Sequence, residues 1–205
     1  MRYKSLAQVV SLVVVSVFAV GIWSTGGDVD LGWLRFFSLA VLIATAVLNL
    51  WDRFLWRIAL AQRIAGVPRD VRGTWKGTLT SFWQDPTGGE APSPKTVYLV
   101  VRQTSTTVSV VLFTDELRSN STLARVQSSN GLLSLNYLYV GRPESRLEDR
   151  SRMHNGSASL DIAGLPATRL RGRYWTDRDS RGELEFSDRS SKLADDYQGA
   201  RDLFE

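Results

Sequence analysis

Two long apolar stretches occupy the first quarter of the chain. Leu6 to Trp23 is uncharged and contains three polar residues, and Leu31 to Trp51 is the second stretch. A helix of 18 residues is about 27 Å long, which is close to the thickness of the hydrocarbon core of a bilayer. The pattern predicts two transmembrane helices, at about residues 6–23 and 31–51, in an N-terminal segment of residues 1–51.

Positive charges lie before the first stretch and after the second, which are expected to be on the same side of the membrane. Arg2 and Lys4 precede the first stretch, several arginines follow the second, and the connector at 24–30 has none. The positive-inside rule then places both termini, and everything after residue 51, in the cytoplasm. A cleaved signal peptide is the alternative for the first stretch. Trp56 is among the aromatic residues expected at the membrane interface.

Residues 52–67 alternate arginines with apolar residues at helical spacing. We expect them to continue the second helix as a juxtamembrane stalk, which Gly66 and Pro68 end.

From Val71 onward, short runs of alternating apolar and polar residues are separated by Gly, Pro, Asn and Asp. Such runs predict strands, and no helical period interrupts them before residue 190. The eight expected strands are Arg72–Trp83, Thr96–Gln103, Thr107–Thr114, Ser119–Gln127, Leu132–Val140, Met153–Ile162, Thr168–Thr176 and Gly182–Ser187. The polar segments 84–95 and 141–151 are expected loops, and Ser129-Asn130-Gly131 is an expected hairpin turn.

Short sequential strands with tight turns predict an eight-stranded antiparallel up-and-down β-barrel over residues 68–190. A two-sheet sandwich is the alternative fold. The tail at 191–205 is expected to form one short helix or to fray. The fold class is therefore two N-terminal transmembrane α-helices followed by an all-β domain.

Alternate residues on four of these strands change from apolar at one end to hydroxyl or aromatic at the other. The expected inward sets are Ser119, Ser121, Leu123 and Arg125; Leu133, Leu135, Tyr137 and Tyr139; His154, Gly156, Ala158, Leu160 and Ile162; and Leu170, Gly172, Tyr174 and Thr176. This pattern fits a half-filled barrel with a polar mouth that holds a small ligand. A barrel filled by its own side chains and a barrel that holds an apolar ligand are the alternatives.

The amino-acid composition excludes several kinds of catalytic and metal site. The chain has no Cys and one His, which excludes thiolate metal sites, Cys nucleophiles and multi-His metal centres. Residues 66–205 carry 19 Lys and Arg against 18 Asp and Glu, so the net charge of +4 comes mostly from the N-terminal part. A near-neutral β domain argues against binding to DNA or RNA. No metal and no cofactor is expected.

The polar mouth has the residue types that recognise nucleotides. Tyr rings stack on bases, hydroxyls bind base edges or phosphates, and Arg pairs with phosphate. The candidate ligand-binding residues are Ser119, Ser121, Arg125, Tyr137, Tyr139, His154, Tyr174, Thr176 and Arg178. A core role for the tyrosines, surface ion pairs for the arginines and a strand-end hydrogen bond for His154 are the alternatives. Trp75, Gly156 and Gly172 are structural candidates, Trp75 as a plug at the barrel floor.

Three motifs carry a family resemblance. They are Val71-Arg-Gly-Thr-Trp-Lys-Gly77, His154-x-Gly156 and Leu170-Arg-Gly-Arg-Tyr-Trp-Thr-Asp-Arg178 followed by Gly182-Glu-Leu-Glu-Phe186. Together with the two N-terminal apolar stretches, they resemble the two-transmembrane β-barrel effectors of bacterial CBASS antiphage systems. The resemblance covers nearly the whole chain, although the GTWxG opening also occurs in lipocalin-like and avidin-like barrels.

The resemblance implies a receptor and effector, not an enzyme. A partner cyclase would make a cyclic dinucleotide during phage infection, and the cytosolic barrel would bind it. Binding would cause homo-oligomerisation of the transmembrane helices in the bacterial inner membrane, disruption of the lipid bilayer and abortive-infection cell death. The alternative function is a membrane-tethered scaffold whose barrel binds a protein or lipid partner. An enzyme that uses Glu116 or Glu183 is a third hypothesis.

Overall fold

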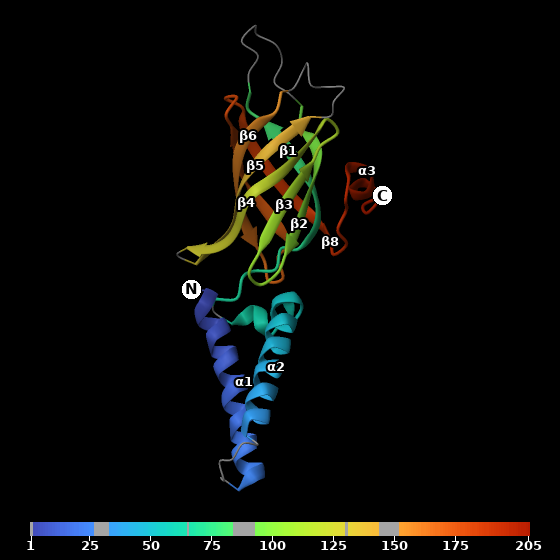
Figure 1. Ribbon diagram of the computed structural model, residues 1–205. Coiled ribbons are helices and arrows are strands. Elements are labelled where there is room, and N and C mark those ends of the chain that lie inside the picture. Colours follow the sequence, from blue (N-terminus) through green and yellow to red (C-terminus); the bar gives the residue numbers. More distant parts are fainter. Residues whose placement is uncertain (1, 27–32, 65, 84–92, 130, 144–151) are drawn as a thin grey trace. The chain divides into compact units, whose positions relative to one another are not determined.

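The structure is a computed structural model that describes residues 2–26, 33–64, 66–83, 93–129, 131–143 and 152–205 (Figure 1). The chain divides into two compact units. One comprises residues 1–67 with 104–106, and the other comprises residues 68–103 and 107–205. The predicted connector at 24–30, the loops at 84–95 and 141–151 and the turn residue Asn130 lie wholly or partly outside the described residues.

Both apolar stretches form helices. The first unit contains α1 (Arg2–Thr25) and α2 (Trp33–Arg53), which contact each other. Over the described part of the chain, however, no helix is both long enough and apolar enough to cross a membrane. The prediction of two transmembrane helices is therefore wrong, and so is the multi-pass inner-membrane location that depended on it.

The second helix does not continue as a stalk. It ends at Arg53, and the backbone of Phe54 leaves the helical region with φ −134°. Two short 3-10 turns follow, η1 (Leu55–Arg57) and η2 (Ala61–Arg63). Trp56, expected at a membrane interface, is fully buried.

Eight strands form a closed barrel in which each strand pairs antiparallel with its neighbours in sequence, and β1 also pairs with β8. They are β1 (Gly73–Ser81), β2 (Lys95–Gln103), β3 (Val108–Phe113), β4 (Leu117–Ser129), β5 (Leu132–Pro143), β6 (His154–Ala163), β7 (Arg169–Thr176) and β8 (Arg181–Ser190). The prediction of an eight-stranded antiparallel up-and-down barrel is confirmed.

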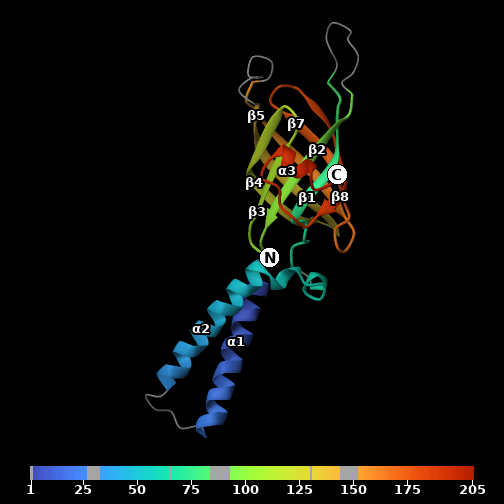
Figure 2. The ribbon, with the colours of Figure 1, turned by 90° about the vertical axis from the view of Figure 1, so that its right-hand side faces the viewer.

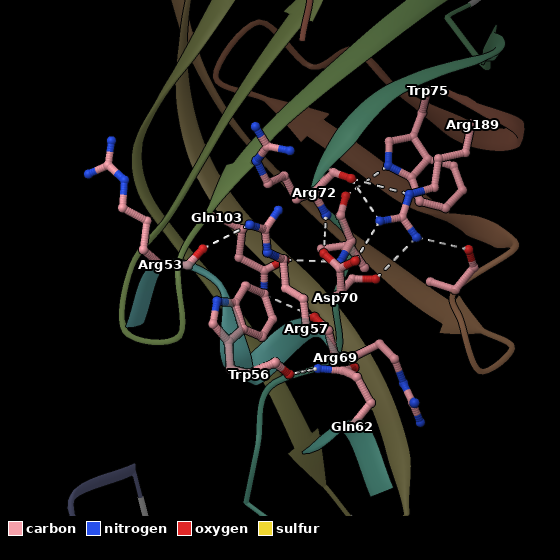
Figure 3. A network of polar contacts seen from close by, with 12 residues as sticks. Arg53, Trp56, Arg57, Gln62, Arg69, Asp70, Arg72, Trp75, Gln103 and Arg189 are labelled. Atoms are coloured by element: carbon pink, nitrogen blue, oxygen red, sulfur yellow. Dashed lines mark hydrogen bonds and ion pairs between the residues drawn. The ribbon is translucent and has the colours of Figure 1, made fainter. Parts of the chain in front are cut away.

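One end of the barrel is closed by its own side chains. Trp75 is fully buried there, and its indole N–H donates to the carbonyl of Val71 at 2.9 Å. The guanidinium of Arg189 lies over the Trp75 ring, 5.2 Å from its centroid, and pairs with the Asp70 carboxylate at 2.9 Å (Figure 3). Arg189 also donates to the Arg72 carbonyl at 2.7 Å. This network fills the floor, so a ligand cavity must open at the other end.

The C-terminal segment covers part of the outer barrel wall. The helix α3 (Tyr197–Arg201) packs beside β2 and β3 (Figure 2). Ala194 and Ala200 of the segment are buried there against four outward-facing side chains of the barrel wall: Tyr98, Val100, Val111 and Phe113. The tail therefore belongs to the second unit as a packed element.

Candidate functional site

A pocket of about 620 Å³ lies inside the barrel at the end opposite Trp75. Its walls come from the strand ends that meet there: the ends of β1, β3, β5 and β7 and the starts of β2, β4, β6 and β8. Its size is within the range of small-molecule sites, which are about 300–1,000 Å³. The up-and-down topology alone brings these eight strand ends together.

The pocket gathers most of the predicted ligand-binding residues. Seven of the nine line it: Ser119, Tyr137, Tyr139, His154, Tyr174, Thr176 and Arg178. Four of the seven form two pairs that are spaced by two along a strand, Tyr137 with Tyr139 on β5 and Tyr174 with Thr176 on β7, as expected for residues on one face of a strand. Their ligand-binding role remains a prediction, but their convergence on one cavity is a property of the fold.

Ser121 and Arg125 do not line the pocket, and for Arg125 a β-bulge is the reason. The pairing of β4 with β5 shifts register between Ser121 and Leu123, so that Thr122 is an extra residue. Beyond the bulge, Ala124 and Val126 join the core and Arg125 is exposed on the outer wall. The inward placement expected for Leu123 and Arg125 is therefore wrong. The Ser121 hydroxyl accepts a hydrogen bond from the Val110 amide at 2.9 Å.

Three rings line the wall from the interior to the mouth. The centroids of Tyr137 and Tyr139 are 5.8 Å apart, and those of Tyr139 and His154 are 6.3 Å apart in an edge-to-face arrangement. Gly156 makes room for this row, because a Cβ there would overlap the Tyr139 hydroxyl and ring. The other structural candidate, Gly172, lies so close to the Ser159 carbonyl that a Cβ would overlap it.

His154 is the polar end of the row. The Arg178 guanidinium donates to its Nδ1 at 2.7 Å, while the Arg152 carbonyl lies 3.3 Å from the same nitrogen. Both contacts cannot be hydrogen bonds at once, because the first needs a lone pair on Nδ1 and the second needs a proton. The shorter contact to a donor-only group decides for the lone pair, and hence for a neutral ring that is protonated on Nε2.

The electrostatics of the mouth agree with a neutral histidine. Burial, the largest cause, and the charge of Arg178 lower the pKa of His154, although the Arg152 carbonyl and Asp177 oppose the shift. Asp177 itself accepts hydrogen bonds from the backbone and side chain of Asn155, both at 3.0 Å, and these lower the pKa of its carboxyl group.

Deeper in the pocket the three tyrosines are neutral. Burial raises the pKa values of Tyr137, Tyr139 and Tyr174 above the usual value for tyrosine. Their hydroxyls are therefore donors and acceptors at physiological pH. The pocket thus has an uncharged aromatic interior and charged groups at its mouth.

Sequence reasoning missed several lining residues. Lys95, the first residue of β2, lines the mouth and pairs with Glu116 at 3.0 Å. Other residues not proposed from sequence are Leu79, Ser81, Trp83, Leu112, Thr114, Leu117, Ser180 and Leu184. Lys95 could have been found from the expected strand order, because in an up-and-down barrel the start of β2 lies at the same end as the end of β7.

A larger hollow of about 1000 Å³ lies beside the mouth. It is lined by Phe82, Trp83 and the outward-facing side chains of Arg173, Trp175 and Arg181. It shares Trp83, Tyr174, Thr176 and Ser180 with the inner pocket, but most of the rest of its lining is exposed. The inner pocket is lined in addition by the buried side chains of Leu112, Tyr137 and Leu184. We therefore take the inner pocket as the functional site.

The carboxylates of the enzyme hypothesis do not share a site. Glu116 lines the inner pocket, whereas Glu183 pairs with Arg171 at 3.6 Å on the outer wall. Over the described residues, no group of three His, Asp or Glu side chains is arranged to hold a metal ion.

Two comparisons with known proteins point to one family. Residues 67–188 match the model of a family described as Cap15, cyclic dinucleotide receptor domain. The chain is also 30% identical over 155 residues to CD-NTase-associated protein 15 from Staphylococcus schleiferi, which covers 76% of this chain and 80% of that protein. The family match contains all of the inner pocket.

Proposed function

Since this chain belongs to the Cap15 cyclic dinucleotide receptor domain family, we propose that it is a CBASS antiphage effector whose barrel binds a cyclic dinucleotide in the inner pocket. The proposed role is that of a receptor that responds to a second messenger, and we assign it no catalytic step. The observation that carries the proposal is the division of the pocket into an aromatic interior and a mouth with cations.

This division matches the two parts of a nucleotide. Bases are planar and stack on aromatic rings, whereas phosphates are anionic and pair with Arg and Lys. In the proposed complex, Tyr139 and Tyr174 contact a base, and Arg178 and Lys95 contact the phosphates. Ser119, a residue of the pocket wall that is 3% exposed, supplies a hydroxyl.

For a phosphate to bind at the mouth, Arg178 and Lys95 must give up contacts that they make in the free protein. Arg178 now donates to His154, and Lys95 pairs with Glu116. A phosphate between the two cations would compete with these contacts, and it would favour a charged His154 ring. The mouth is therefore the part of the pocket that we expect to rearrange.

We propose that the ligand-bound form self-associates through the outer wall. A closed barrel has no free strand edge, so assembly must use side chains. Leu123, Leu138 and Trp175 are 65%, 49% and 53% exposed. They lie in one row, because Leu123 pairs with Leu138, Leu138 with Ser157, and Ser157 with Trp175. The membrane step expected from sequence is not part of this proposal, because it needed the two transmembrane helices.

Thermal melting of the full chain against a panel of cyclic di- and trinucleotides tests the receptor function. A ligand at about 100 times its dissociation constant adds about 2.7 kcal/mol, which raises the melting temperature by a few degrees for a chain of this size. A selective rise with one class of cyclic dinucleotide is expected. An unchanged melting temperature across the whole panel would favour the alternative, a scaffold whose barrel binds a protein or lipid.

A further inference from the structure

One buried polar group in the pocket has no protein partner. The hydroxyl of Tyr137 has no hydrogen-bond partner among the described residues, although its side chain is in the barrel core and the residue is 4% exposed. Tyr174, which lines the same pocket, differs in this respect, because its hydroxyl shares a hydrogen bond with Ser81. The two tyrosines are therefore not equivalent.

An unpartnered buried hydroxyl is unfavourable for the free protein. Nearly all buried polar groups in proteins have a partner, and one that has none keeps the cost of its removal from water. Phenylalanine would fill the same space beside Tyr139, whose ring centroid is 5.8 Å away, without that cost. Stability of the empty barrel therefore does not account for the oxygen of Tyr137.

Tyr137 lies deep in the pocket, away from the charged groups. It is six residues before the end of β5 at Pro143, whereas Lys95 begins β2 and Arg178 lies in the turn after β7. The pocket lining also includes the apolar side chains of Leu112 and Leu184, which are 7% and 1% exposed. A ligand whose phosphates stay with the cations at the mouth would therefore present a base to Tyr137.

We propose that the Tyr137 hydroxyl is the specificity-determining group of the pocket and hydrogen-bonds the edge of one base of the cyclic dinucleotide. This inference rests on the proposed function. The hydroxyl can donate to a ring nitrogen or carbonyl oxygen of the base and accept from an amino group. In an apolar surrounding, a base that offers no matching group leaves the hydroxyl unpartnered, so the pocket discriminates against that base.

The variant Tyr137→Phe separates this role from ring stacking. Dissociation constants of the full chain are measured for cyclic dinucleotides that differ in their bases, and the melting temperature is measured without ligand. We expect the variant to melt at the same temperature as the wild type or higher. We also expect about tenfold weaker binding of the preferred ligand, with a smaller ratio between preferred and disfavoured ligands.

Tyr98→Phe is the matched control, because Tyr98 is equally buried but lies under α3 on the outer wall. It should leave every dissociation constant unchanged. The inference is overturned if Tyr137→Phe retains the wild-type selectivity ratio, whether its affinity is unchanged or uniformly reduced. If the wild type binds no cyclic dinucleotide, the proposed function itself fails, which is a different result from a wild type that binds and a variant that is equally selective.

Discussion

At the scale of single residues, the mouth of the pocket depends on the protonation state of one histidine. Burial of His154 and the neighbouring Arg178, which donates to its Nδ1, lower the pKa of His154, so the folded protein favours the neutral ring. The unfolded chain has no such preference and binds a proton near pH 6.5, the ordinary value for histidine. The two states therefore bind different numbers of protons over a defined range of pH.

The sign of the resulting pH dependence follows from the lowered pKa of His154. Below about pH 6.5 the unfolded chain takes up a proton more readily than the folded chain, so stability should fall as the pH falls toward the folded pKa. Melting temperatures between pH 8 and pH 5 measure this loss, and His154→Gln should reduce it. Asp177 acts in a separate range, below its ordinary pKa of 3.8. An equal decline in the variant would show that His154 does not control it.

Two arginines provide a matched pair for the phosphate contact. Arg178 lines the pocket, and Arg125 is exposed on the outer wall beyond the bulge. Arg178→Ala should weaken cyclic dinucleotide binding about tenfold to hundredfold, because it removes a charge-assisted hydrogen bond. Arg125→Ala should change the dissociation constant less than twofold. Titration calorimetry at two salt concentrations measures both, and equal effects of the two changes would contradict the assignment of the site.

At the scale of elements, alternation predicted the inward faces of β5, β6 and β7 but failed on β4. The inward residues Tyr137, Tyr139, His154 and Tyr174 lie two or four residues from apolar core positions on the same strand, so their direction could be predicted from the sequence. The bulge at Thr122 could not be predicted from the sequence. The alternation of polar and apolar residues continues on both sides of the extra residue, but the residues that face inward change from odd-numbered to even-numbered positions.

The C-terminal segment is another element whose position the sequence left open. Thr74 of β1, which is fully buried, holds this segment on the barrel. Its hydroxyl donates to the Lys192 carbonyl at 2.8 Å and accepts from the Ala194 amide at 3.0 Å. One side chain thus satisfies two backbone groups that lie more than 100 residues away in sequence.

Removing this hydroxyl should loosen the segment. Thr74→Val keeps the shape of the side chain but leaves the amide of Ala194 and the carbonyl of Lys192 unpartnered, which should lower the free energy of unfolding by about 1–3 kcal/mol. Denaturant unfolding and amide hydrogen exchange at Ala194 measure the effect. Thr78→Val, at an exposed position of the same strand, should stay within about 0.5 kcal/mol of the wild type. If Ala194 exchanges no faster in the Thr74 variant, the segment is held by other contacts.

At the scale of the whole molecule, the barrel was predictable and the character of the N-terminal unit was not. Eight short alternating runs leave few topologies, because sequential strands with tight turns pair with their neighbours. The helices α1 and α2 form where the apolar stretches predict them, but the inference from their length and apolar character to two membrane spans was wrong.

The proposed self-association of the whole molecule can be tested on the outer wall of the barrel. If the row of Leu123, Leu138 and Trp175 is the contact surface, Leu138→Lys should abolish the larger species that forms with ligand and leave the dissociation constant unchanged. Sedimentation velocity with and without ligand measures this. Leu132→Lys is the control, because Leu132 is 71% exposed at the closed end of the barrel. Ligand-induced assembly of the Leu138 variant at wild-type levels would rule out this surface.

The most direct test of the central claim uses the tyrosines as reporters. The chain has six, of which Tyr137, Tyr139 and Tyr174 line the inner pocket and Tyr98 and Tyr197 lie together on the outer wall. Ring resonances of the tyrosine-labelled full chain are followed by NMR during titration with a cyclic dinucleotide. Binding inside the barrel predicts large, saturable shifts of the three pocket tyrosines and none for the outer pair. Shifts confined to Tyr98 and Tyr197, or no shift at saturating ligand, would contradict the account.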